Sequence, residues 1–120
     1  MQTDTRVAVD QVADGAGRPV TVLRFAGDIS STSKEAVRGT YQGLEKGAHP
    51  RILLDFGGVE YLNSSGIALV IQVLLEASRS EQTVRIFGLT PHFQKVFTMV
   101  GITRYTTLYT DEATAAGSFE

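Results

Sequence analysis

The segment RILLDF, residues 51–56, constrains the fold more than any other stretch, because Ile52, Leu53 and Leu54 follow one another without alternation. A short apolar run of this kind predicts a strand buried in the middle of a sheet. After Asn63 the apolar residues recur instead at the spacing of a helical face. They are Ile67, Val70, Ile71, Leu74 and Leu75. We therefore expect a central strand followed by a buried helix.

Turn residues set the expected boundaries of these two elements. Gly57 and Gly58 are expected to break the strand, Asn63 to cap the helix, and the helix to extend to about Arg79. Before the central strand, Val7 and Val9 alternate with polar residues, DGAGRP supplies a turn, and VTVLRFAG alternates again. This pattern predicts an N-terminal β-hairpin.

Two further helices and two further strands are expected. The run Thr32–Glu35 fits a capping box, and the helix that it starts has an apolar stripe at Val37, Tyr41 and Leu44 and can end at Gly47. TVRIFGL predicts a fourth strand, residues 91–101 a third helix that begins at a proline and stops at a glycine, and RYTTLY a last short strand.

The resulting order, ββαβαβαβ, predicts an α/β fold with a mostly parallel sheet of four to five strands, an N-terminal hairpin and helices packed against the sheet. The 120 residues are interpreted as a single domain. We expect an ordered core at about residues 6–110 and a loose tail at residues 111–120, because the tail is small and polar.

Charge and composition exclude several classes of function. Eleven basic and thirteen acidic residues give a net charge of −2 without a run of Lys or Arg, so no nucleic-acid partner is expected. The absence of cysteine excludes disulfides and thiolate metal sites. The most apolar run, residues 66–77, is interrupted by Gln72 and Glu76 and is too short to span a membrane. With no signal-peptide pattern, we expect a cytoplasmic protein without direct membrane insertion.

Two serines occupy the expected first turn of the second helix. With Asn63 as N-cap, Ser64 and Ser65 take the first two helical positions. The amides of the first turn and the helix dipole favour an anion, so a phosphate on Ser64 would be tolerated without refolding. The alternative is that two small polar residues merely begin a helix.

Leu69 departs from the apolar stripe of the same helix. On a helical wheel it lies nearly opposite Ile67 and Ile71, on the face of Ser65, Gln72 and Glu76. We expect it to be exposed, where a protein partner could bury it at the centre of an interface that a phosphate on Ser64 would disrupt. A single exposed leucine is also ordinary on a protein surface.

The stretch ILLDFGGVEYLNSSGIALVIQVLLEA resembles the central strand, loop and helix of STAS domains, the fold of bacterial anti-sigma factor antagonists. VTVLRFAGDIS resembles the second strand and following loop of that family. TVRIFGLTPHFQKVFTMVGITRYTTLYTDEATA resembles its last strands and helices. The resemblance covers about residues 6 to 115.

The resemblance implies a function as a phosphoprotein that regulates transcription by partner switching. A serine kinase of the ATP-binding type, which is also the anti-sigma factor, would phosphorylate Ser64, and a phosphatase would restore binding. Asp28 matches the acidic residue beside the serine, and Asp55 the aspartate at the end of the central strand. With Ser65 as the alternative acceptor, we expect the partner-binding residues to be Asp28, Ser30, Asn63, Ser64, Ser65, Gly66, Leu69 and Gln72.

Asn63 departs from the family, whose usual motif has aspartate at this position. Asparagine still caps the helix, but a kinase that needs the carboxylate would use the motif poorly. The departure keeps a second function open: a constitutive STAS interaction subunit of a larger signalling complex or lipid-transport system, with no phosphorylation cycle.

We expect no enzyme activity, cofactor or metal. A serine hydrolase needs a base near its nucleophile, and the two histidines, His49 and His92, lie in segments outside the serine loop. NSSGI is not a nucleophile elbow, and Gly57-Gly58 lacks the spacing of nucleotide-binding glycine motifs.

Overall fold

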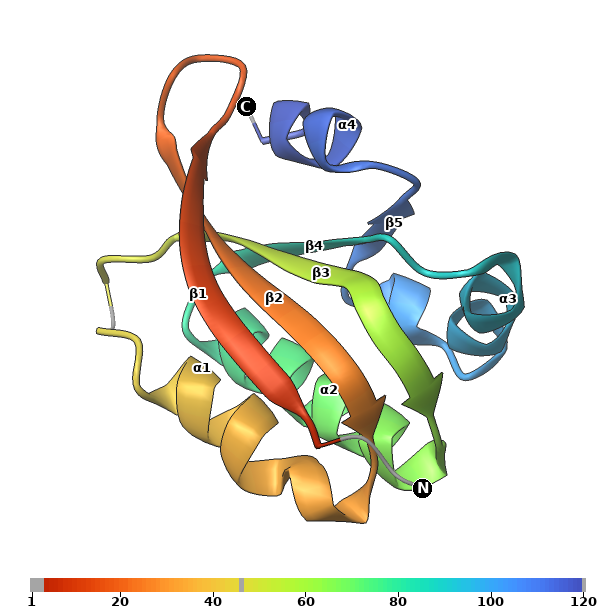
Figure 1. Cartoon of the computed structure of the whole chain (residues 1–120). Coiled ribbons are helices and arrows are strands. Elements are labelled where there is room, and N and C mark those ends of the chain that lie inside the picture. Colours follow the sequence, from red (N-terminus) through yellow and green to blue (C-terminus); the bar gives the residue numbers. More distant parts are fainter. Residues whose placement is uncertain (1–3, 46, 120) are drawn as a thin grey trace.

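A computed structural model describes residues 4–45 and 47–119 of the chain. It contains a five-stranded sheet in the order β1-β2-β3-β4-β5 (Figure 1). Strand β1 pairs with β2 antiparallel, and the other neighbours pair parallel. The strands are β1 (Arg6–Ala13), β2 (Pro19–Ile29), β3 (Arg51–Leu62), β4 (Thr83–Phe87) and β5 (Thr107–Tyr109). The predicted α/β fold, with its hairpin and mostly parallel sheet, is confirmed.

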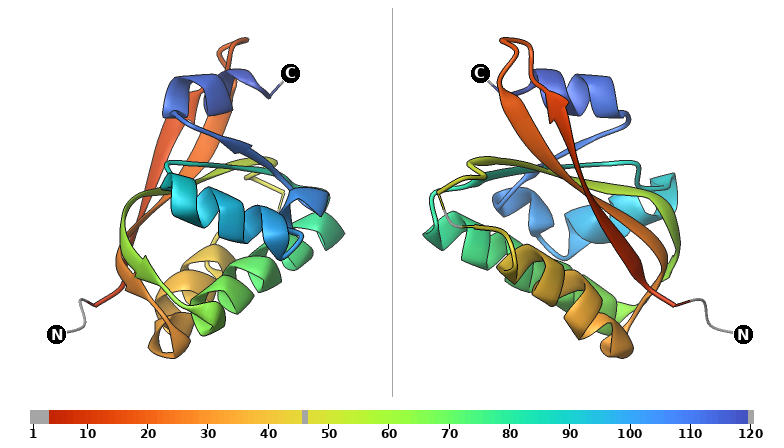
Figure 2. Two further views of the ribbon diagram at one scale, coloured as in Figure 1. Left: turned by 90° about the vertical axis from the view of Figure 1, so that its right-hand side faces the viewer. Right: turned by 60° about the vertical axis from the view of Figure 1, so that its left-hand side comes forward.

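Helical segments cover the two faces of the sheet unequally (Figure 2). The turns η1 (Ser31–Ser33) and η2 (Glu35–Gly39) lead into α1 (Thr40–Gln42), which lies with α2 (Ser64–Arg79) on one face. Helix α3 (Pro91–Met99) and the turn η3 (Ile102–Arg104) add Phe97 and Ile102 to the core on that face. Helix α4 (Glu112–Gly117) lies on the other face.

Alternation along β2 gives the sheet two separate cores. Leu23 and Phe25 point into the larger core, which the first three helices cover, while Val20 and Val22 point into a smaller core beneath α4. Successive strand side chains point to opposite faces, so a strand that is apolar at adjacent positions needs cover on both. In β2 and β3, α4 and the residue Phe119 that follows it cover the second face of the sheet.

The expectation of a loose C-terminal tail was wrong, because the tail forms α4 and packs on the sheet. Ala115, Ala116 and Phe119 are buried in the smaller core. Asp111 caps the helix by accepting the Thr114 N–H at 2.8 Å. Small alanines allow a short helix to lie close to the sheet, and the sequence of the tail has too few large apolar residues to reveal this packing.

The helix is also tied to the sheet by charge. Arg24 donates to Asp10 at 3.0 Å, to Asp55 at 2.9 Å and to Glu112 of α4 at 2.7 Å. These acidic neighbours, chiefly Glu112, raise the pKa of the Arg24 guanidinium. One arginine thereby joins three strands to the last helix.

Gly57 and Gly58 do not break the central strand as expected, because β3 continues to Leu62. A Cβ on Gly58 would lie 2.9 Å from the Phe25 carbonyl oxygen of β2. The register between β2 and β3 shifts at this position. The two glycines therefore permit a close, irregular strand pairing, which is a common role of glycine within strands.

The first helical segment has a different cap and end from those expected. The Ser30 N–H donates to Ser33 Oγ at 2.9 Å, and the helical turns begin at Ser31 rather than after the Thr32–Glu35 box. Helix α1 ends at Gln42, before Gly47. Its expected apolar stripe is confirmed, since Val37 and Tyr41 are buried and Leu44 packs against the core.

The boundaries of the other two long helices were predicted well. Asn63 caps α2, which ends at Arg79, and α3 begins at Pro91 behind a Thr90 cap that accepts the Phe93 N–H at 3.2 Å. Gly101 adopts a left-handed φ of 86° just after α3. In each case a local capping signal coincides with the start or end of an apolar periodicity.

Candidate functional site

The carboxyl ends of β2 and β3 meet the first turn of α2. The Asn63 N–H donates to the Ile29 carbonyl at 3.3 Å, which joins the end of β2 to the start of the helix. The Asn63 side chain accepts the Gly66 N–H at 2.9 Å, as an N-cap does. This corner of the molecule is thus fixed by backbone groups and one amide side chain.

Gly66 sets how closely α2 approaches the sheet. A Cβ at this position would lie 2.2 Å from the Ile29 carbonyl oxygen and 2.9 Å from Leu62 Cδ1. No side chain fits there, because both obstacles belong to the packed ends of β2 and β3. Steric contact therefore explains why a glycine follows the two serines, and the sequence alone did not reveal this contact.

Ser64 and Ser65 are both exposed on the first turn of α2. No hydrogen bond joins either hydroxyl to another residue in the described part of the chain. The fold of the described residues does not use these two hydroxyls, and both are accessible at the surface.

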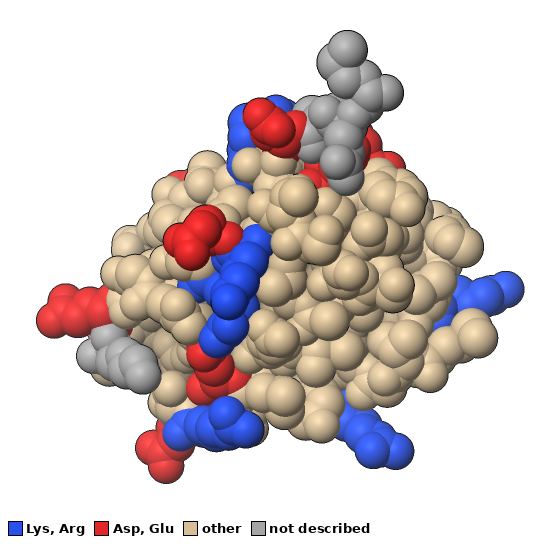
Figure 3. Space-filling model, turned by 90° about the horizontal axis from the view of Figure 1, so that it is seen from below, with Lys and Arg blue, Asp and Glu red and all other residues tan. Residues whose placement is uncertain are grey.

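The surface around the serines carries no charge along α2. From Ser64 to Leu75 the helix contains no Asp, Glu, Lys or Arg. Ala68 and Gln72 are exposed on it, and Ile71 and Leu75 are half-buried at its edge. Viewed from below, a broad area right of the centre of the molecule shows no charged side chain, and charged side chains lie around its edge (Figure 3). We call the exposed residues Ser64, Ser65, Ala68 and Gln72 the α2 surface.

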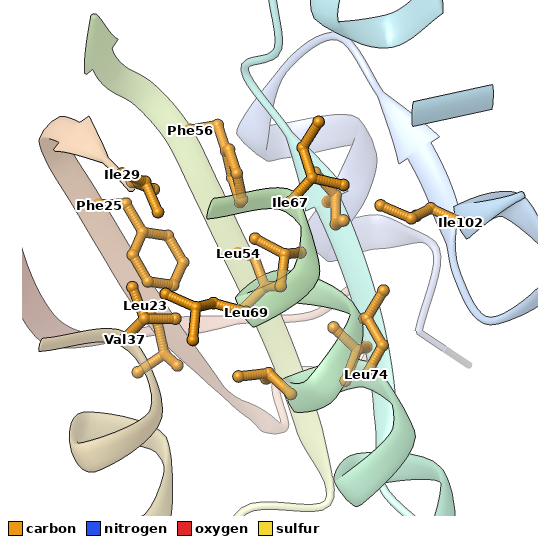
Figure 4. Packing of buried hydrophobic residues seen from close by; sticks show 14 of the residues in the cluster. Leu23, Phe25, Ile29, Val37, Leu54, Phe56, Ile67, Leu69, Leu74 and Ile102 are labelled. Atoms are coloured by element: carbon orange, nitrogen blue, oxygen red, sulfur yellow. The ribbon is translucent and has the colours of Figure 1, made fainter. Parts of the chain in front are cut away.

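Leu69 does not belong to the α2 surface, and its expected exposure was wrong. Only 7% of the residue is accessible to solvent. Its side chain extends from α2 toward Leu23 and Val37 (Figure 4). The helical wheel failed because α2 is covered on two sides, by the sheet and by the segment that contains η2 and α1.

Two polar contacts hold that segment on α2. Arg38 Nη2 donates to Glu76 Oε1 at 3.0 Å, and Gln42 Nε2 donates to the same oxygen at 3.1 Å. Glu76, which the wheel placed on an exposed face, is thereby the anchor of the neighbouring helix. The buried face of α2 is wider than the sequence indicated.

Ser30 and Asp28, at the corner between β2 and η1, lie away from the α2 surface. Ser30 is buried, and its hydroxyl lies 3.2 Å from that of Thr32, so it supports the turn. Asp28 is half-buried and stands in register with Tyr61 of β3. Because strand side chains alternate, Asp28 lies on the sheet face opposite Ile29 and α2.

The sequence interpretation missed two exposed residues at this corner. Tyr61 is 50% exposed beside Asp28, and Ala68 lies one helical turn beyond Ser64. The alternation of Tyr61 with the buried Leu62 was the signal that could have found the tyrosine. Of the expected partner residues, Ser64, Ser65 and Gln72 are exposed on α2 and Asn63 is half-buried beside them, whereas Gly66 is buried beneath the serines.

The remaining candidates for a chemical role are the histidines and the clustered acidic side chains. The described residues contain no group of His, Asp or Glu side chains that could hold a metal ion. His49 is half-buried, with Nδ1 2.6 Å from Thr21 Oγ1, and His92 is exposed. Within the same part of the chain, no helix is long and apolar enough to cross a membrane.

Comparison with known proteins gives a consistent result. A family model described as "Mlab, STAS domain" matches residues 12–110. No curated protein matches the chain significantly. Among solved structures, an anti-sigma factor antagonist from Mycobacterium paratuberculosis is similar with a TM-score of 0.76 at 17% identity, over 96% of this chain and 95% of that one.

Two other solved structures are similar over nearly as much of the chain. An anti-sigma-factor antagonist (STAS) domain protein from Planctomyces limnophilus gives a TM-score of 0.71 at 22% identity, over 92% of this chain and 94% of that one. The Bacillus cell fate determinant SpoIIAA in its phosphorylated form gives 0.64 at 21% identity, over 88% and 92%. At such identities the likeness establishes the fold.

Proposed function

The chain belongs to the STAS domain family, and from this premise we propose that it is an anti-sigma factor antagonist-like binding module switched by reversible phosphorylation of Ser64. A partner that is both serine kinase and anti-sigma factor binds the unphosphorylated α2 surface. Phosphorylation releases the partner, and a phosphatase restores binding. The domain acts in the cytoplasm as a substrate and a ligand, with no chemistry of its own.

The exposed and unengaged hydroxyl of Ser64 carries this proposal. Ser64 is the first residue of α2, and its hydroxyl makes no hydrogen bond to a described residue. A kinase can therefore reach it without opening the core. A negative group at the first turn of a helix is favoured by the helix dipole, so the phosphorylated protein keeps its fold.

The lack of charge on the α2 surface makes a phosphate there effective. A phosphate adds a charge of about −1.5 to −2 at neutral pH. On an uncharged interface that charge must lose its water without gaining a partner, which opposes association. A partner with an acidic rim would be repelled in addition.

Similar folds are compatible with both states of such a switch. SpoIIAA, whose fold resembles this one, has been solved in an unphosphorylated and a phosphorylated form. Transferring the modification to this chain is part of the proposal, and it rests on the resemblance of Ser64, Ser65 and Gly66 to the serine motif of the family. Ser65 is the alternative acceptor.

The proposal is tested with purified baits exposed to a lysate of the native cell, followed by identification of the retained proteins. Wild type and Ser64→Ala should retain a serine kinase of the ATP-binding type, and Ser64→Asp should lose it. Wild type incubated with that kinase and ATP should gain one phosphate, which Ser64→Ala should not.

Ser78→Asp is the matched control, because Ser78 is exposed on α2 but lies outside the α2 surface. It should bind as wild type does. If Ser64→Asp also binds normally while its unfolding is unchanged, phosphorylation of Ser64 is not the switch. If Ser78→Asp loses binding as well, the effect of charge is not local to Ser64.

The second candidate is a constitutive STAS interaction subunit of a larger signalling complex or lipid-transport system. Asn63 favours it, because a kinase that reads an aspartate before its target serine would find none here. In this function wild type, Ser64→Ala and Ser64→Asp retain the same partners, and no phosphate is found on the protein from its native cell.

A further inference from the structure

A second polar site lies at the opposite end of the sheet from Ser64. A pocket of about 270 Å³ opens where β3 and β4 begin, and three arginines line it. Arg18 comes from the turn after β1, Arg51 from the first residue of β3, and Arg85 from β4. Three of the eleven basic residues of an overall acidic chain thus meet at one pocket.

The guanidinium of Arg18 is held in place from two sides. Its Nε donates to Asp14 Oδ2 at 2.7 Å, and its Nη2 donates to the Phe119 carbonyl at 3.1 Å. The Asp14 side chain is fully buried and also accepts the N–H groups of Ala16 and Arg18. Asp14 is therefore part of the wall behind the arginines rather than a group that competes for their open side.

Arg51 is fixed only through its Nε, which donates to the Pro19 carbonyl at 3.2 Å and lies 3.8 Å from Asp14 Oδ2. No described residue accepts a hydrogen bond from its two terminal nitrogens. The fork of N–H donors that binds carboxylates and phosphates is thus oriented but unused.

Arg85 completes the positive cluster. Its Nε donates to Ser118 Oγ at 3.3 Å, and its guanidinium carbon lies 5.5 Å from the centre of the Phe119 ring. No carboxylate of the described residues forms an ion pair with it. Stacking on the ring holds the guanidinium in place without neutralising it.

The balance of charge indicates the class of ligand. Among the described residues, three guanidiniums face two carboxylates, the buried Asp14 and the exposed Glu81 at the edge of the pocket. Thr83 and Ser118 add hydroxyls to the lining. We infer that this pocket binds a phosphate group, either as the free ion or as a monoester on a small molecule, through Arg51 and Arg85. The site is independent of Ser64, since β3 separates the two along its full length.

Binding is tested by amide chemical shifts on titration of the whole chain with inorganic phosphate, phenyl phosphate and acetate. Phosphate and phenyl phosphate should shift the signals of Thr83, Arg85 and Ser118, and acetate should bind about tenfold more weakly. Tighter binding of phenyl phosphate than of the free ion identifies a monoester as the ligand. The reverse order identifies the free ion.

Substitutions then assign the donors. Arg51→Gln and Arg85→Gln should each weaken phosphate binding about tenfold, which corresponds to about 1.4 kcal/mol. Arg51→Lys keeps the charge without the fork and should weaken it less. Arg104→Gln is the control, since Arg104 is exposed in η3 outside the pocket.

Three results would overturn the inference. They are shifts confined to the start of α2, equal binding of acetate and phosphate, or unchanged binding in Arg51→Gln and Arg85→Gln. Unperturbed signals at Ile67 and Val70 in each variant show that the fold is intact. A variant that loses these signals is replaced by Arg51→Lys, whose smaller but measurable weakening is then required.

Discussion

The two ends of β3 are built by different kinds of interaction. At the carboxyl end, backbone packs on backbone, since a Cβ on Gly66 would lie 2.2 Å from the Ile29 carbonyl oxygen, and the α2 surface outside contains no charged residue. At the amino end, side chains hold side chains, with Arg18 donating to Asp14 at 2.7 Å. One strand therefore supports a surface shaped by steric contact and a pocket shaped by charge.

This difference explains what each end can recognise. The α2 surface presents small, uncharged side chains on a rigid helix, which suits contact with another protein and makes an added phosphate disruptive. The arginine pocket presents oriented donors, which suits a small anion. We therefore expect substitutions at the carboxyl end to change stability through packing. At the amino end, we expect the effect of removing the Asp14 carboxylate on stability to depend on pH.

The largest effect is expected for Leu69→Ala, which tests whether the carboxyl end hides its leucine. Removing this buried side chain should lower the free energy of unfolding by about 3 kcal/mol, through lost burial and an unfilled cavity. Urea unfolding measures this loss. Gln72→Ala, on the exposed face of α2, is the control, and its free energy of unfolding should stay within about 0.5 kcal/mol of the wild-type value. If Leu69→Ala is as stable as wild type but loses partner binding, Leu69 is a residue of the interface and not of the core.

Gly66→Ala tests the steric contact itself. The added methyl group collides with the Ile29 carbonyl, so the first turn of α2 must move, at a cost of about 2 kcal/mol. Gly117→Ala is the matched control, because a Cβ there meets no atom within 4 Å and should change stability by less than about 1 kcal/mol. Equal stability of the two variants would show that α2 does not depend on a close approach.

Asp14→Asn tests the role of charge at the amino end. Burial alone would raise the pKa of the Asp14 carboxyl, but donors from Arg18 and Ala16 together hold this pKa below its ordinary value of 3.8. A lowered pKa adds stability that is present above pH 3.8 and is lost as the pH falls through the value in the folded protein. The variant should therefore have a lower free energy of unfolding than wild type at neutral pH. The loss should be smaller than that in Leu69→Ala.

Unfolding at neutral pH and at a pH below 3.8 measures this prediction. The gap between wild type and Asp14→Asn should narrow in acid. Glu60→Gln, an exposed substitution near the carboxyl end of β3, is the control and should change stability at neutral pH by less than about 0.5 kcal/mol. A gap for Asp14→Asn that stays constant would mean that geometry rather than charge holds the amino end.

Asn63→Asp should have the smallest effect of the four. Aspartate caps a helix as well as asparagine does, and its charge favours the helix dipole, so stability should change by less than about 0.5 kcal/mol. Asn63→Ala should cost about 1 kcal/mol, because the Gly66 N–H loses its acceptor. Thermal unfolding compares the three caps, and a costly Asn63→Asp would point to an acidic neighbour at the cap.

The sequence predicted those elements whose signals are local. Asn63 followed by an apolar periodicity located α2, and Pro91 located α3, because caps and prolines act on the residues beside them. The central strand was evident from the consecutive apolar residues Ile52, Leu53 and Leu54. The serines were likewise placed correctly at the exposed first turn.

The features that were missed depend on distant neighbours. Leu69 is buried by the segment that contains η2 and α1, and a helical wheel of α2 cannot include that segment. The strand β3 continues through Gly58 because it pairs there with β2. The arginine pocket gathers residues 18, 51 and 85, too far apart in the chain to form a basic run. The tail packs because its alanines fit a sheet face that only the fold creates.

The account depends most on the α2 surface being the place where a partner binds. The direct measurement is photo-cross-linking in the native cell from a photoreactive residue at position 68, with the same residue at the exposed position 103 of η3 as the control. We predict an adduct with a serine kinase from position 68, its loss when Ser64→Asp is added, and none from position 103. An adduct from position 103 alone, or one from position 68 that survives Ser64→Asp, would contradict the account.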